Sequence, residues 1–143
     1  MNILVIDDSK MWCTLMLSSL ESKGHDVTTS QDVKEAAELL RNNKYDAVLL
    51  DLDIHNWLPV AETIPYIKAH YAGPLVIISG QSKKEAYVGK EIYLPKALAE
   101  DPTILNHTVV MAVHTDSTRM FKRNTSKKSY VNAVLSFPLA FLK

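Results

Sequence analysis

The sequence ILVIDDS at residues 3–9 contains four apolar residues, two acids and a side chain that can cap a helix. An unbroken apolar run predicts a strand buried on both faces, because a half-exposed strand alternates apolar and polar side chains. Ser9 is a suitable N-cap, and Trp12, Met16 and Leu20 follow it at helical spacing up to Gly24. The segment therefore predicts a buried strand leading into an amphipathic helix.

The same alternation of apolar runs and helical periods continues along the chain. Further strands are predicted at 25–29, 47–50, 75–78 and 92–94, the first of them short and polar. Helices are predicted at 32–42, at 60–70 and after Pro102 as far as Val113, and Pro65 must kink its helix or mark its first turn. Continuous apolar strands separated by amphipathic helices predict an α/β fold, a parallel sheet covered on both faces.

Polar residues follow four of the predicted strands: Asp7 and Asp8, then Asp51, Ser79 and Lys96. The carboxyl ends of parallel strands lie at one edge of the sheet, and ligands bind there, where the strand order reverses. With the order 2-1-3-4-5, the reversal lies between the first and third strands. We therefore expect three carboxylates, a hydroxyl and an ammonium to meet at that edge.

A cluster of three carboxylates is repulsive unless a cation neutralises it, and oxygen ligands favour Mg²⁺. With Mg²⁺ and Lys96 present, a carboxylate becomes a usable nucleophile that can form an aspartyl-phosphate. The hydroxyl of Ser79 can hydrogen-bond a phosphoryl oxygen. The predicted site thus suits Mg²⁺-dependent phosphoryl transfer to an aspartate.

Over about residues 2–118, the sequence resembles the receiver domains of two-component response regulators. The resemblance rests on four motifs in order, "VIDDS" with Asp7-Asp8, "AVLLDLD" with Asp51, "VIISG" with Ser79 and "YLPK" with Lys96. It implies a flavodoxin-like, doubly wound, five-stranded parallel sheet of order 2-1-3-4-5. It also implies a stand-alone receiver, because no recognisable output domain follows.

The resemblance implies which residues of the predicted site bind the metal ion. It makes Asp51 the phosphoacceptor and also a metal ligand, and Asp7 and Asp8 the acids of the metal site. It implies that Asp53 supplies a backbone carbonyl to Mg²⁺. We hypothesise in addition that Asp53 and Gln81 tune the lifetime of the phosphate.

The resemblance also assigns the residues of a conformational switch. Lys96 would bind the phosphoryl group, and Asp51 and Ser79 would be the other catalytic residues. Ser79 and Tyr93 would form the switch pair. The phosphate donor would be a histidine kinase or a histidine phosphotransfer protein. Slow autodephosphorylation would reset the switch, with no turnover of an external substrate.

The sequence departs from the family pattern near this site. The usual Pro and Gly after the phosphoacceptor are missing at 54–57, where His55 stands, and Pro59 is displaced. Only 17 positions separate Ser79 from Lys96, which predicts a shortened fourth helix. Ala97 follows Lys96 where the family has proline, so we expect a trans peptide bond, since a non-proline cis bond costs about 3 kcal/mol.

Alternative interpretations of the same motifs remain open. A pseudo-receiver would keep the fold as a protein-interaction module without being phosphorylated. Asp51-Leu52-Asp53 also resembles the nucleophile motif of haloacid dehalogenase-type phosphatases, although the acidic metal pair of that family follows the lysine. Trp12, Met11 and Met16 are interpreted as core or helix surface, and Cys13 as an unreactive thiol.

The charge divides the chain into two parts. Residues 1–118 carry 10 Lys/Arg and 16 Asp/Glu, whereas residues 119–143 carry 6 Lys/Arg and no acid. We predict a receiver domain at 1–121 and a basic, apolar extension at 122–143, which could pack on the body or form a homodimer, bind a membrane surface, or dock a partner. The acidic body argues against nucleic-acid binding, and the absence of a leader motif favours a cytoplasmic protein.

Overall fold

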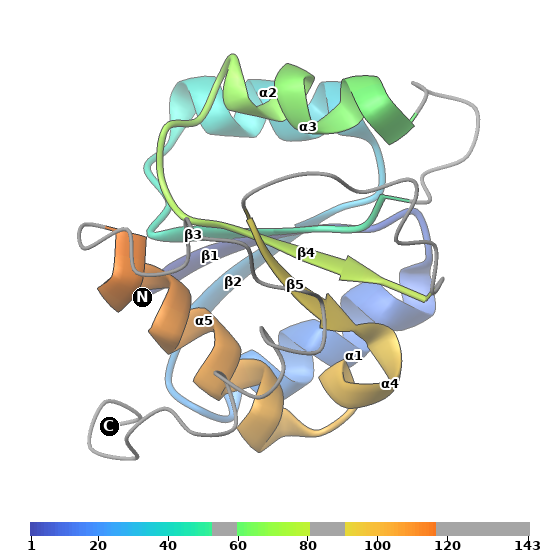
Figure 1. Ribbon diagram of the computed structural model, residues 1–143, viewed down its shortest axis with the longest axis vertical. Helices are drawn as coiled ribbons and strands as arrows, with labels where there is room; N and C mark the ends of the chain where they lie inside the picture. The colour runs from blue at the N-terminus through green and yellow to red at the C-terminus, as the bar shows by residue number, and fades with distance from the viewer. Residues whose placement is uncertain (53–59, 81–90, 117–143) are drawn as a thin grey trace.

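The computed structural model describes residues 1–52, 60–80 and 91–116, which form a parallel sheet between two layers of helices (Figure 1). The strands are β1 (Asn2–Ile6), β2 (Asp26–Ser30), β3 (Ala47–Leu50), β4 (Leu75–Ser79) and β5 (Ile92–Pro95). The helices are α1 (Lys10–Glu21), α2 (Val33–Asn42), α3 (Val60–Lys68), α4 (Lys96–Ala99) and α5 (Pro102–Asp116). The strand order β2-β1-β3-β4-β5 confirms the predicted α/β fold.

The helices cover the two faces of the sheet in separate groups. Helices α2 and α3 lie on one face, and α1, α4 and α5 lie on the other (Figure 1). The α4 helix of the structure follows β5 and is not the predicted shortened fourth helix, which falls within 81–90, outside the described residues. The covering of both faces explains why the central strands are apolar without alternation.

The β1 strand divides its side chains between two cores. Ile3 and Val5 face the core beneath α1 and α5, whereas Leu4 and Ile6 face the core beneath α2 and α3, and all four are fully buried. In contrast, the β2 strand is polar because it lies at the edge of the sheet, where its side chains are partly exposed. The exposure of β2 therefore accounts for its polar side chains, whereas β5, at the opposite edge of the sheet, is buried and largely apolar.

Local signals fix the ends of α1. The hydroxyl of Ser9 accepts a hydrogen bond from the backbone N–H of Trp12 at 3.3 Å, which confirms the predicted N-cap. Gly24 has a φ of 88°, the left-handed conformation that glycine adopts without a Cβ clash. In α3, Pro65 lies inside the helix, beyond its first turn. The Ser9 N-cap places the start of α1 directly after the acidic pair Asp7-Asp8.

The α5 helix is buried more completely than its sequence pattern indicated. Among the apolar residues at helical spacing, Leu105, Val109 and Ala112 are buried and Val113 is partly buried, and every other residue between Leu105 and Ala112 is buried as well. Among the described elements, α5 contacts α1, α4 and the strands β3, β4 and β5. None of the helices in the described ranges is both long enough and apolar enough to cross a membrane.

Candidate functional site

The register of β1 and β3 brings two predicted site residues to the same level. Ile6 pairs with Leu50 on the neighbouring parallel strand, so that Asp7 and Asp51 follow at adjacent strand ends. The backbone N–H of Asp51 donates to the Ile6 carbonyl at 2.9 Å, and that of Asp7 donates to the Ser30 carbonyl at 3.0 Å. Both acids are thus held by the sheet itself, at the point where the strand order reverses.

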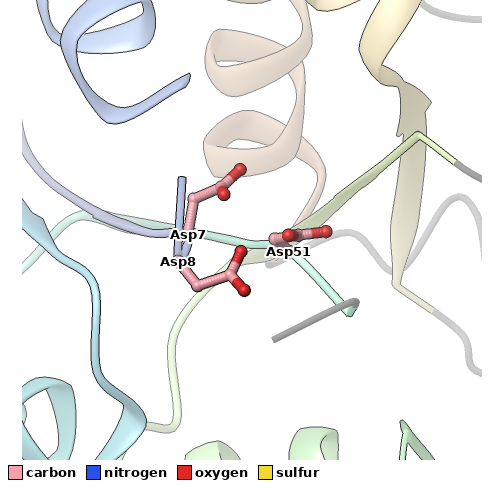
Figure 2. Close-up of side chains that lie close together, drawn as sticks. All are labelled: Asp7, Asp8 and Asp51. Atoms are coloured by element: carbon pink, nitrogen blue, oxygen red, sulfur yellow. The ribbon is translucent and has the colours of Figure 1, made fainter. Parts of the chain in front are cut away.

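Three carboxylates gather at this edge. One oxygen from each of Asp7, Asp8 and Asp51 lies within 4.8 Å of the others, and Figure 2 shows the three side chains grouped at the ends of β1 and β3. Asp7 and Asp51 are buried, whereas Asp8 is partly exposed. The structure therefore brings together the three acids that the sequence predicted as neighbours.

Lys96 supplies the positive charge of the cluster. Its Nζ lies 2.9 Å from Oδ2 of Asp7 and 3.4 Å from Oδ2 of Asp51. The side chain is 13% exposed, and it starts from the first residue of α4, directly after β5. Its stem passes the end of β4, because a methyl group added to Gly80 would lie 3.5 Å from Cδ of Lys96. The Lys96-Ala97 bond is trans, as expected.

The ammonium of Lys96 stays charged in this environment. Burial opposes the charged form, but the hydrogen bond and charge of Asp7 together with those of Asp51 outweigh it, so the pKa of Lys96 lies above its ordinary value of 10.5. Three acids and one ammonium leave an excess of negative charge at the edge of the sheet. That excess can be neutralised by a bound cation.

The cluster fits a hard divalent cation by two observations. Its donor set consists of carboxylate oxygens, the ligands that Mg²⁺ prefers. Within the described ranges, Oδ2 of Asp7 is fully buried, and the Lys96 ammonium faces it at 2.9 Å. Asp53, from which the sequence predicts a carbonyl ligand, lies outside the described residues, as do Gln81 and His55.

The backbone and the neighbours of Asp7 hold its carboxylate in place. The N–H of Ser9 donates to Oδ1 of Asp7 at 2.9 Å, and the thiol of Cys13 donates to the Asp7 carbonyl at 3.1 Å. Burial, followed by the charge of Asp7, raises the pKa of Cys13 from 9.0 to about 11. A thiol that stays protonated is a poor nucleophile, which agrees with the unreactive thiol expected from the sequence.

Ser79 and Tyr93, the predicted switch pair, lie on the two strands beyond β3. Ser79 is the last residue of β4, is buried and pairs in register with Pro95, the residue before Lys96. Tyr93 lies within β5, pairs with Ile77 and is buried in the core beneath α2 and α3. Ser79 thus reaches the same edge as the acids, whereas Tyr93 belongs to the adjoining core.

Sequence reasoning missed one residue of the site. The ring centroid of Trp12 lies 5.1 Å from Nζ of Lys96, within the range of a cation–π interaction. The half-buried position of Trp12 agrees with its interpretation as core or helix surface. The signal that could have found it is its spacing from Ser9, which places it in the first turn of α1 beside the acidic pair.

The fold and the acidic edge define a class, the doubly wound α/β proteins with an oxygen-ligand site where the strand order reverses. Within that class, the response regulator receiver domain family matches residues 3–101. The chain belongs to this family. The family resemblance inferred from the sequence motifs is thereby confirmed.

Solved structures show the same fold. A two-component response regulator from Clostridium difficile is 24% identical, with a TM-score of 0.70 over 79% of this chain and 95% of its own. A CheY-like receiver from Methanospirillum hungatei JF-1 is 18% identical, with a TM-score of 0.71 over 82% and 96%. The Francisella response regulator 1452 receiver domain is 26% identical, with a TM-score of 0.65 over 79% and 96%.

Proposed function

We propose that this chain is a phosphoacceptor receiver of a two-component phosphorelay. A phosphoryl group passes from a phosphohistidine donor to Asp51 with Mg²⁺ present, and slow autodephosphorylation removes it. The observation that carries the proposal is the position of Lys96, whose ammonium lies 3.4 Å from Oδ2 of Asp51 within the cluster of three acids. An ammonium at this position can neutralise charge on a phosphoryl group transferred to that oxygen.

The proposed transfer balances with no further reactant besides water. A carboxylate oxygen of Asp51 forms a bond to phosphorus while the bond from phosphorus to the donor imidazole breaks, and the imidazole nitrogen keeps the electron pair and takes up a proton from water. Mg²⁺, when bound by Asp7, Asp8 and Asp51, supplies charge neutralisation at the phosphoryl oxygens. Lys96 supplies the second positive charge, and the burial of Asp51 limits the access of water to the acyl phosphate.

The proposal includes a conformational output. Ser79 is suited to hydrogen-bond a phosphoryl oxygen because it ends β4 at the edge that carries the acids. We propose that Ser79 and Tyr93 shift together when phosphate arrives, and that Asp53 and Gln81 set the lifetime of the phosphate. Turnover of an external substrate is not part of the proposed function.

The partners and the division of the chain are also proposals. The donor is a histidine kinase or a histidine phosphotransfer protein in the cytoplasm. The receiver domain spans 1–121, and the extension at 122–143, in which ten of the 13 residues from 130 to 142 are apolar, contributes a homodimer contact. Deletion of 122–143 tests this: size-exclusion chromatography with light scattering should show loss of the dimer, whereas an unchanged mass would contradict it.

The deciding experiment for phosphorylation is intact mass spectrometry with Mg²⁺ and acetyl phosphate. The wild-type chain should gain one phosphoryl group, and Asp51→Asn should gain none. Asp26→Asn is the matched control, because Asp26 is an exposed acid on the edge strand β2 and should leave the gain intact. No Mg²⁺-dependent gain would favour the pseudo-receiver, a binding module that is not phosphorylated.

A further inference from the structure

The ammonium of Lys96 is enclosed by groups from three different elements. Asp7 at the end of β1 lies 2.9 Å away, and Asp51 after β3 lies 3.4 Å away. The indole ring of Trp12, in the first turn of α1, faces the same ammonium with its centroid 5.1 Å from Nζ. The two carboxylates compensate the charge, and the ring contributes an electron-rich face without adding a further negative charge.

The start of α1 fixes the ring relative to the acids. The hydroxyl of Ser9 accepts the N–H of Trp12 itself, and the N–H of Ser9 donates to Oδ1 of Asp7. Ser9 therefore links the carboxylate that contacts the ammonium to the residue whose ring faces the same ammonium. The ring is partly buried against the core beneath α1, which limits its rotamers.

A lysine without such an enclosure would be poorly placed. The side chain has four rotatable bonds, and ordering it costs up to about 2 kcal/mol of conformational entropy. Its ammonium is strongly hydrated, so that solvent-facing rotamers compete with the buried one. At Lys96 the side chain is 13% exposed, which leaves the buried arrangement dependent on the groups that face it.

We propose that Trp12 is a positioning residue for Lys96, whose ammonium the indole ring holds between Asp7 and Asp51. The ring does not contact the reacting atoms and acts through the lysine. The consequence for phosphoryl binding rests on the proposed function, whereas the contact between ring and ammonium does not. The lysine is then in place for a phosphoryl group before one arrives.

The proposal predicts effects of opposite sign on two ligands. In Trp12→Leu, Lys96 populates solvent-facing rotamers, so that beryllofluoride, a phosphoryl mimic, should bind about three- to tenfold more weakly with Mg²⁺ saturating. Mg²⁺ alone should bind at least as tightly as in the wild type, because the ammonium competes with it for Asp7 and Asp51. A purely structural role for Trp12 would weaken both ligands together, and that result overturns the proposal.

Two further variants test whether the aromatic ring of Trp12 itself is needed for beryllofluoride binding. Trp12→Phe keeps an aromatic face and should recover most of the beryllofluoride affinity that Trp12→Leu loses. Met11→Leu changes the adjacent residue on α1, which is 69% exposed, and should leave both affinities unchanged. Equal losses in Trp12→Phe and Trp12→Leu would contradict a role for the aromatic ring.

Fluorescence tests the contact without any phosphoryl ligand. The chain holds two tryptophans, so a Trp57→Phe background leaves Trp12 as the reporter. Lys96→Gln should change the emission of Trp12, and Lys44→Gln, at an exposed lysine, should not. An unchanged emission in Lys96→Gln overturns the proposal. A changed emission in a protein that binds no beryllofluoride supports the positioning role while it rejects the proposed function.

Discussion

Nζ of Lys96 lies closer to Asp7 than to Asp51, at 2.9 Å from Oδ2 of the first and 3.4 Å from Oδ2 of the second. The lysine therefore pairs most closely with an acid proposed to hold the metal, and only next with the proposed phosphoacceptor. Both the ammonium and a divalent cation use carboxylates that belong to one cluster. The two cations are expected to oppose each other's binding.

Removing Lys96 tests this opposition directly. Lys96→Gln should bind Mg²⁺ about fivefold more tightly, a change of about 1 kcal/mol, because the bound metal no longer faces a neighbouring ammonium. Isothermal titration calorimetry at fixed ionic strength gives the two affinities, with Lys44→Gln as the control for loss of a lysine. An unchanged Mg²⁺ affinity in Lys96→Gln would show that the ammonium and the metal do not share the cluster.

Neutralising one acid should stabilise the metal-free protein. Asp8→Asn removes one of three carboxylates that one lysine balances, so the free energy of unfolding in chelator should rise by about 1 kcal/mol. Added Mg²⁺ should stabilise Asp8→Asn less than the wild type, because a ligand is lost. Urea unfolding with and without Mg²⁺ measures both effects, and a lower stability in chelator would argue against repulsion within the cluster.

The thiol of Cys13 should titrate only in strongly alkaline solution. Its pKa rises from 9.0 to about 11 on folding through burial and the charge of Asp7, so the folded state holds the proton more tightly than the unfolded state. The contribution of Cys13 to stability is then complete below pH 9.0 and is lost as the pH rises to about 11. Thiolate absorbance of the folded protein should show this late midpoint.

A denatured sample supplies the reference for the same titration. Its thiol should ionise near pH 9.0, the ordinary value for cysteine. A folded-state thiol midpoint at 9.0 or below would contradict the burial of Cys13.

The raised pKa of Lys96 also makes stability fall at high pH, because the stabilising charge of the ammonium is lost as the pH climbs above 10.5.

Loss of the N-cap of α1 should cost stability. Ser9→Ala removes the acceptor for the Trp12 N–H and should lower the free energy of unfolding by about 1 kcal/mol. The hydrogen bond from the backbone N–H of residue 9 to Asp7 does not need the hydroxyl, so Mg²⁺ affinity should change little. Ser9→Thr, which keeps the hydroxyl, should retain most of the stability in chemical unfolding.

A methyl group at Gly80 should be accepted. The added Cβ would meet Cδ of Lys96 at 3.5 Å, an ordinary van der Waals distance, and Gly80 does not have a left-handed φ. Gly80→Ala should therefore change the unfolding free energy by less than about 1 kcal/mol and leave beryllofluoride binding intact. A large loss of stability or of beryllofluoride binding would mean that the Lys96 side chain leaves no room for the added methyl group.

The sequence predicted the sheet and the acidic edge because both depend on local patterns. Continuous apolar runs at 3–6 and 47–50 indicated strands buried on both faces, and the acids that follow them converge because parallel strands share an edge. The enclosure of Lys96 was not predictable in this way. Trp12 and Lys96 are 84 positions apart, and their contact depends on the packing of α1 against the end of the sheet.

The burial of α5 was another feature that periodicity could not supply. A repeat of Leu105, Val109 and Ala112 describes one face of a helix, whereas Val110 and Met111 are buried as well. How many sides of a helix are covered depends on the surrounding tertiary structure, which a single-helix pattern does not describe. The same limit applies to Cys13, whose burial beside Asp7 follows from the packing of α1.

Lys96 is both the charged group of the site and the first residue of α4, a helix of four residues that contacts α5. The backbone of Lys96 follows Pro95 directly, and Pro95 pairs in register with Ser79 at the end of β4. The helix has no side-chain cap at its start, and it contacts α5, β4 and β5. One residue therefore joins the charge at the sheet edge covalently to the start of a helix, so the two lie next to each other in the chain as well as in space.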